Sequence, residues 1–281
     1  HCVIIGFEKG NQAARRLFTY ADIKAEPEER LVKNINPYLI DGPDMFVEKR
    51  SKPLAALPEI RYGSKPTDGG FLIIEPEDYD AIMADPIAAK YVRPFVGAKE
   101  LIHGLSRWCL WISDDEVEDA RRSLLISERL IRVAEFRSSS KKDATKALAV
   151  FPHQFSERRQ PEHGYVCIPS HFSENREYAT VKWFNEKAVA GNANFTADDP
   201  DGFLFAIISS LMFMTWQRLV GGRLKSDLRF SNTLVWNNFP LPPIDEDLRE
   251  RIVAAGEKIL VAREHSGAQA CRPILRVRYH L

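Results

Sequence analysis

The stretch 222–231 carries the strongest signal for recognition chemistry in this sequence. It places three cations, Arg223, Lys225 and Arg229, and the hydroxyl of Ser231 directly after the very apolar segment 203–219. Cations held on a buried support can neutralise the phosphates of a polyanion, and such contacts give an affinity that depends on salt. We therefore expect these four side chains to face a nucleic acid.

Polar side chains of further segments have the types that read the edges of bases. The candidates are Ser173, Glu174 and Arg176 in the loop 170–176, Asn185 and Lys187 after the next predicted strand, and Asn194 in a turn. In the major groove, Arg and Lys pair with guanine, Asn with adenine and Glu with cytosine. Asn and Ser are also ordinary turn formers, so a purely structural role stays open for them.

The turn 64–70 adds Lys65, Thr67 and Asp68 to the candidate residues. It precedes a predicted strand at 71–74, so its position depends on that strand. We expect the three side chains either to contact the DNA backbone or to brace a neighbouring loop.

Motifs for catalysis are incomplete. The tripeptide 36–38 (NPY) resembles the tetrapeptide with which adenine-N6 methyltransferases hold a flipped base, but the second Pro and the fourth aromatic residue are missing. His163, Cys167 and His171 recur every four residues, which suggests zinc. In a predicted strand that spacing spans about 13 Å, too far for ligands of one tetrahedral ion. We expect neither catalysis by this chain alone nor a cofactor or metal bound to it.

Charge is balanced in total but segregated along the chain. The 281 residues include 39 basic and 39 acidic ones. Cations concentrate at 129–146 and 218–229, and acids at 75–85, 114–119 and 245–250. A surface for a polyanion must therefore come from gathering charge on one face.

Cysteine usage and hydropathy bear on the compartment. The four cysteines are scattered, and three of them sit beside apolar residues and read as reduced core thiols, which favours the cytoplasm. The longest apolar run, 203–216, is shorter than the ~20 residues of a membrane span, so no membrane partner is expected.

The pattern of apolar residues predicts an α+β fold, with mixed short-strand sheets around a buried central helix and then a C-terminal helix. Strands are expected at 3–7, 15–19, 45–47, 71–74, 107–112, 165–168, 177–184 and 233–236. Helices are expected at 76–84, 86–91, 124–137, 143–149, 203–219 and 245–264. Residues 26–34 read as a polar connection. Asp245 is the expected N-cap of the last helix.

Five motifs, in order, resemble the MmeI-like DNA methyltransferases of restriction-modification systems. They are 36–44 (NPYLIDGPD), 64–70 (SKPTDGG), 93–100 with 107–111, 168–169 with 173–178, and 222–227 with 237–240. The resemblance implies that 1–22 are the last strands of a methyltransferase domain and that 23–243 form the target recognition domain. It also implies that 244–281 begin a C-terminal helical domain and include a poorly specified tail.

The resemblance further implies sequence-specific recognition of double-stranded DNA within an adenine-N6 DNA methyltransferase. S-adenosylmethionine is then expected in an upstream domain, because the chain looks cut from something longer. The expected partners are double-stranded DNA and that upstream methyltransferase domain or subunit. The alternative is a protein-interaction module that docks onto a methyltransferase subunit without touching DNA.

Overall fold

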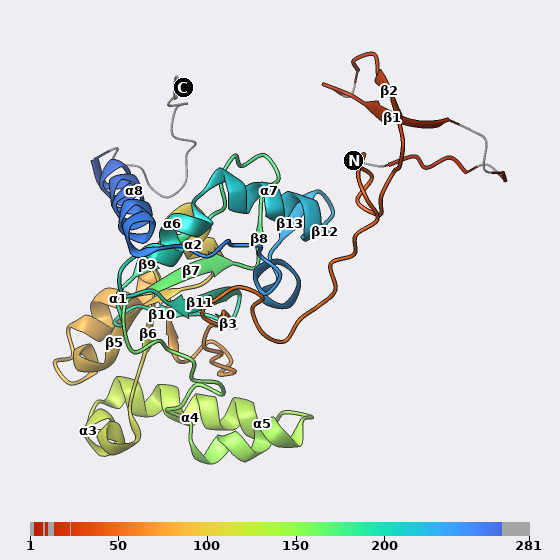
Figure 1. The fold of residues 1–281 in the computed structure, drawn as a ribbon. Coiled ribbons are helices and arrows are strands. Elements are labelled where there is room, and N and C mark those ends of the chain that lie inside the picture. The colour runs from red at the N-terminus through yellow and green to blue at the C-terminus, as the bar shows by residue number, and fades with distance from the viewer. Residues whose placement is uncertain (1–2, 8, 11–13, 23, 266–281) are drawn as a thin grey trace.

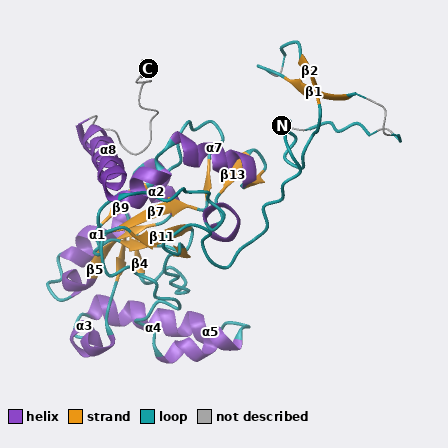
Figure 2. Cartoon of the chain, in the orientation of Figure 1, coloured by secondary structure: helices purple, strands orange, loops and turns teal. Residues whose placement is uncertain are grey.

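The computed structural model describes all of residues 1–281 except 1–2, 8, 11–13, 23 and 266–281. It confirms the α+β class, with small sheets gathered between groups of helices (Figure 2). None of the helices within the described part of the chain has the length and apolar character to cross a membrane. The predicted tail falls at 266–281 and lies outside the described residues.

Two four-stranded sheets form the centre of the fold. The first has the order β3-β11-β7-β9, built from Arg61–Tyr62, Asn194–Asp198, Tyr165–Pro169 and Lys182–Phe184. The second has the order β10-β5-β6-β4, built from Val189–Ala190, Val92–Val96, Trp108–Leu110 and Ile73–Ile74. All five residues of β7 are buried, because this strand is central in its sheet and both of its faces are covered.

Helices cover the sheets on two sides (Figure 1). On one side lie α3 (Val117–Ala120), α4 (Leu124–Ser138) and α5 (Asp143–Ala147); on the other lie α6 (Phe203–Ile208), α7 (Leu211–Val220) and α8 (Glu246–His265). Further helices, α1 (Pro76–Met83) and α2 (Ala98–His103), and the 3-10 turns Ala88–Tyr91, Asp114–Glu116 and Leu148–Val150 lie between the strands in the chain. The predicted helices at 124–137 and 245–264 are confirmed within a residue, and the Asp245 carboxylate accepts from the Leu248 N–H at 2.9 Å, as an N-cap does.

The predicted central helix 203–219 is two helices, so that prediction is wrong in one respect. The chain breaks at Ser210, whose hydroxyl accepts from the Phe213 N–H at 3.1 Å and begins α7. All six residues of α6 are buried. The Asp199 carboxylate caps α6 by accepting the N–H groups of Leu204 and Phe205, both at 2.9 Å.

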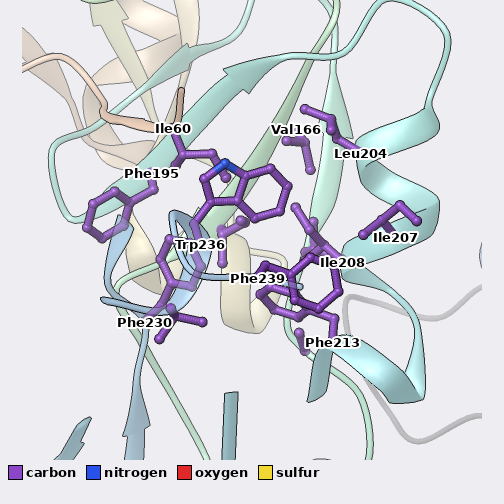
Figure 3. Close-up of a cluster of buried hydrophobic side chains, with 14 of the residues drawn as sticks. Ile60, Val166, Phe195, Leu204, Ile207, Ile208, Phe213, Phe230, Trp236 and Phe239 are labelled. Atoms are coloured by element: carbon purple, nitrogen blue, oxygen red, sulfur yellow. The ribbon is translucent and has the colours of Figure 1, made fainter. Parts of the chain in front are cut away.

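An aromatic cluster at the centre of the molecule packs α6 and α7 against the first sheet. Figure 3 shows Trp236 in the middle of this cluster, and its ring lies 6.3 Å from that of Phe239 at an interplanar angle of 7°. The predicted strand 233–236 is instead a π-helix, Asn232–Trp236. It forms because Ser231 caps it and because the Trp236 indole N–H donates to the carbonyl of Pro58.

The N-terminal region differs most from its prediction. The strand at 15–19 is confirmed as β1 (Arg15–Thr19), but it pairs with β2 (Glu28–Val32), inside the segment expected to be a polar connection. This hairpin lies apart from the rest of the molecule (Figure 1). No strand is assigned at 3–7 or at 45–47.

Candidate functional site

The stretch 222–229 folds as a short antiparallel hairpin that no strand prediction included. Strands β12 (Gly222–Leu224) and β13 (Asp227–Arg229) pair with each other, and β13 also pairs with β8 (His171–Phe172). The turn is possible because Lys225 adopts a left-handed conformation, with φ of 57°. We call residues 222–229 the basic ribbon.

Burial of one face fixes the basic ribbon. Leu228 is fully buried, whereas Asp227 and Arg229 on either side of it are exposed, as strand alternation requires. The Phe230 N–H donates to the Ser170 carbonyl at 3.0 Å, and the buried Gln217 amide donates to the Arg229 carbonyl at 3.1 Å. The cations of the ribbon therefore project from a backbone anchored to the core.

The loop 173–176 contacts the basic ribbon, so two groups of predicted DNA-binding residues lie side by side. Arg223 forms an ion pair with Glu174 at 3.3 Å and also donates to the Ser226 carbonyl. Arg218 of α7 donates to the main-chain carbonyl of Arg176 at 2.6 Å. Ser173 accepts from the Asn175 N–H and shapes the loop. The ribbon and the strand that precedes this loop are thus joined in one small sheet, in which Arg229 pairs with His171, 58 residues earlier in the chain.

Lys65 lies at the same end of the first sheet (β3-β11-β7-β9) as the basic ribbon. A turn at 191–194 joins them, since its Ala193 carbonyl accepts from the Ser170 N–H and its Asn194 carbonyl from the Gly63 N–H, both at 3.0 Å. A Cβ at Gly63 would lie 2.5 Å from the Ala190 carbonyl oxygen, so only glycine permits this approach. Lys65 is exposed at this edge.

Lys65, Lys225 and Arg229 form no ion pair with any residue that the structure describes. All three side chains are exposed. An exposed cation without an internal counterion keeps its full charge for an external anion. This end of the sheet therefore presents positive charge.

Four predicted contact residues make bonds within the fold. Asn194 is fully buried and donates to the Val96 carbonyl at 2.7 Å, which ties the two central sheets together. Asp68 is buried and accepts from the Leu72 N–H at 2.6 Å. The Thr67 hydroxyl contacts that of Ser156 at 2.7 Å, and Ser231 caps the π-helix. For Asp68 and Thr67 the bracing alternative therefore fits the structure.

Asn185 and Lys187 lie at the opposite end of the central sheet. They follow Phe184, which pairs with Tyr165 at the start of β7, whereas the basic ribbon is attached beyond Pro169 at its end. Four strand residues separate these ends by about 13 Å. The Asn185 side chain accepts from the Lys187 N–H at 3.2 Å, as in a turn. The structure does not bring these two residues to the ribbon.

The exposed Asn192 lies in the turn 191–194, which binds Ser170 and Gly63. Its amide is accessible to a base edge, whereas the amide of the buried Asn194 is not. Asn192 and Asn194 flank a small residue in the same turn, and the sequence alone does not tell the exposed amide from the buried one.

Metal ligands do not gather at this site within the part of the chain described. No group of three or more His, Cys, Asp or Glu side chains in that part could hold a metal ion. Cys167, the centre of the suggested zinc spacing, is fully buried, and burial raises the pKa of its thiol far above the usual range. Gly69 and Gly221, the first members of two glycine pairs, face Phe136 and Gln217, so neither pair forms an open cradle for a cofactor.

Comparison with known proteins gives three consistent results. The model of the family described as "MmeI, target recognition domain" matches residues 41–243. DNA methyltransferase A of Bacillus subtilis (strain 168) is 34% identical over 266 residues, which are 94% of this chain and 30% of that protein. The solved structure of the Type IIL restriction-modification enzyme MmeI in complex with DNA matches with a TM-score of 0.81 and 36% identity, over 91% of this chain and 34% of that one. The chain thus spans about a third of the length of both relatives.

Proposed function

Because the chain belongs to the MmeI target recognition domain family, we propose that it reads the sequence of double-stranded DNA for an adenine-N6 DNA methyltransferase of a restriction-modification system. The observation that carries the proposal is the basic ribbon, which presents exposed cations beside a loop that bears a carboxylate and a guanidinium. The MmeI relative was solved with DNA bound, which supports the same partner.

The ribbon and the loop supply the two kinds of contact that recognition needs. Lys225 and Arg229 would bind phosphates, which position the protein on any sequence. Glu174 and Arg176 would approach base edges, where a carboxylate accepts from cytosine and a guanidinium donates to guanine. Arg223 donates to the Glu174 carboxylate and to the Ser226 carbonyl. It would therefore orient the Glu174 carboxylate toward the bases as well as bind the phosphate backbone of the DNA.

S-adenosylmethionine would bind outside this chain. In support, the glycine pairs at 69–70 and 221–222 each begin with a residue packed against a side chain, which argues against an open glycine cradle for the cofactor at either pair. Since the relatives are about three times as long, the methyltransferase domain or subunit would carry the cofactor and be the second partner. The buried thiols Cys109 and Cys167 suit a reducing compartment such as the cytoplasm.

A salt titration of DNA binding tests the proposal. The chain is mixed with a fluorescent duplex of random sequence, and the dissociation constant is measured by anisotropy at several salt concentrations. Replacing Lys225 and Arg229 together with Ala should make the slope of log K against log[salt] shallower by about 1.8, because each lost phosphate contact removes about 0.9. Lys258→Ala, an exposed cation on α8, serves as the control and should leave the slope unchanged.

The competing function, docking onto a methyltransferase subunit without DNA contact, has its own observation. Ile4 and Phe7 are 94% and 92% exposed, and Leu31 of the β1–β2 hairpin is 70% exposed, so the N-terminal region offers apolar surface to a protein. If the wild-type chain fails to bind duplex at low salt, docking replaces DNA reading as the function. If it binds but the ribbon variant keeps the wild-type slope, the ribbon is not the phosphate-binding element.

A further inference from the structure

The basic run 129–146 has no part in the proposed function so far, and the structure divides it in two. Arg129 and Arg137 point inward: Arg129 donates to the Phe71 and Ile73 carbonyls and pairs with Asp78. Lys141, Lys142 and Lys146 are exposed where α4 ends and α5 begins. We call residues 138–146 the lysine corner.

Arg137 holds the lysine corner in place. It is fully buried, and its five N–H groups each reach a main-chain carbonyl at 2.6–3.1 Å. Two of these carbonyls, of Pro66 and Thr67, belong to the turn that carries Lys65. The other three, of Leu148, Phe151 and Gln154, follow α5. The corner is therefore fixed to the Lys65 turn by the side chain that precedes it.

A continuous series of hydrogen bonds leads from the Lys65 turn to the basic ribbon. The Ser64 N–H donates to the Ala190 carbonyl at 2.7 Å, and the turn 191–194 then binds Ser170, which binds Phe230 at the end of the ribbon. In Figure 1, α5 lies at the lower right of the globular part of the molecule, and strands β12 and β13 lie at its upper right. The ribbon, Lys65 and the lysine corner thus belong to one connected edge.

Charge along α4 is polarised toward that edge. The segment 114–122 before its start has five acids against Arg121 and Arg122, whereas the lysine corner has three cations against Asp143. Fifteen helical residues separate the two ends by about 22 Å. In Figure 1, α3 at the acidic end lies toward the left, away from the ribbon. The lysine corner is thus the cationic end of this helix.

We propose that the lysine corner is a second phosphate-binding arm for the same duplex that the basic ribbon binds. This inference rests on the proposed function. Duplex DNA is stiff over a few tens of base pairs, so a protein that contacts it at two separated points needs both contacts at fixed positions. The bonds of Arg137 fix the lysine corner, and the turn of Lys65 is connected by hydrogen bonds to both arms. The corner would raise affinity for all sequences alike, because phosphates carry no base information.

The test replaces Lys141 and Lys142 with Ala in the full chain and repeats the salt titration on random duplex. The expected result is a slope shallower by about 1.8, from two lost phosphate contacts. The matched control replaces Arg121 and Arg122 with Ala, because this pair lies at the acidic end of the same helix, is also exposed, and includes Arg122, which is paired with Asp119. The control should keep the wild-type slope, and all variants should keep the wild-type thermal unfolding.

The outcomes separate the two ideas. If the wild-type chain binds no duplex, the proposed function and the second arm fail together. If the ribbon variant has a shallower slope while the corner variant matches wild type, only the second arm is overturned. If the corner variant and the Arg121 and Arg122 control lose the same slope, the effect is general charge, and the second arm is again overturned.

Discussion

Arg137 and Arg229 belong to two equally basic stretches of the sequence and end in opposite environments. Arg137 is fully buried, and main-chain carbonyls accept from all five of its N–H groups. Arg229 is exposed, and the contact that fixes it is made by its own carbonyl, which accepts from Gln217. A run of cations in a sequence therefore does not reveal which of them the fold uses.

The difference follows from the cost of removing charge from water. Burial lowers the pKa of the Arg137 guanidinium, because removal from water disfavours the charged form. A buried cation is therefore stable only when every donor is paired. Two carbonyls of the turn 66–67 and three of the segment 148–154, which follows α5, meet that need. Exposed cations keep their hydration and exchange counterions for phosphates, which is what a DNA-binding surface requires.

The largest expected effect is on folding, from Arg137→Met. Methionine fills similar space but leaves five buried carbonyls without their donor, so the free energy of unfolding should fall by about 4 kcal/mol or more. Urea unfolding monitored by circular dichroism measures it. Arg229→Met should change that free energy by less than about 0.5 kcal/mol while weakening DNA binding.

If Arg137→Met does not fold, Arg137→Lys still tests the assignment. An ammonium has three donors and can replace only part of the five bonds, so its stability should lie between the wild type and the Met variant. Wild-type stability for Arg137→Lys would contradict the bracing role.

A pair of asparagines sharpens the same comparison with a smaller effect. The Asn238 amide is buried and donates to the carbonyls of Glu48, Thr233 and Leu234 at 2.8–3.2 Å. Asn238→Asp puts a carboxylate opposite three carbonyls, so the free energy of unfolding should fall by about 2–3 kcal/mol. Asn192→Asp, at an exposed turn, should change it by less than about 0.5 kcal/mol. Equal urea midpoints for the two variants would refute the contrast.

Local signals sufficed for the long helices. The repeat of apolar residues predicts α4 and α8, and Asp245 marks the start of α8. The basic ribbon gave no strand signal, because Gly222 and Asp227 are poor strand formers and its pairing partner, His171, lies far away in the chain. The π-helix 232–236 looked like a strand because its composition is β-branched and aromatic, and only contacts with the segment 58–60 decide otherwise.

The candidate site was predictable in its residue types but not in its geometry. Cations and loop residues chosen for their chemistry, such as Arg223 and Glu174, do meet. Asn192 and Asn194 have the same side chain, and what separates them is a bond from Asn194 to Val96, 98 residues earlier. Burial of that kind depends on tertiary packing, so the sequence could not tell the exposed amide from the buried one.

The smallest expected effect lies at the acidic end of α4 and concerns pH. The pKa of Asp85 is held below its usual 3.8, first by a hydrogen bond from the Ser123 hydroxyl and then by one from the Ala88 N–H. A folded-state pKa below the unfolded one stabilises the fold above about pH 4, and that contribution is lost as pH falls through the folded value.

Asp85→Asn should therefore lose less Tm than wild type between pH 5 and pH 3. Ser123→Ala should flatten the profile in the same direction, whereas Ser127→Ala, whose hydroxyl donates to the Arg121 carbonyl, should follow the wild type. Parallel profiles for Asp85→Asn and wild type would show that the bonds of this carboxylate to Ser123 and Ala88 do not stabilise the fold.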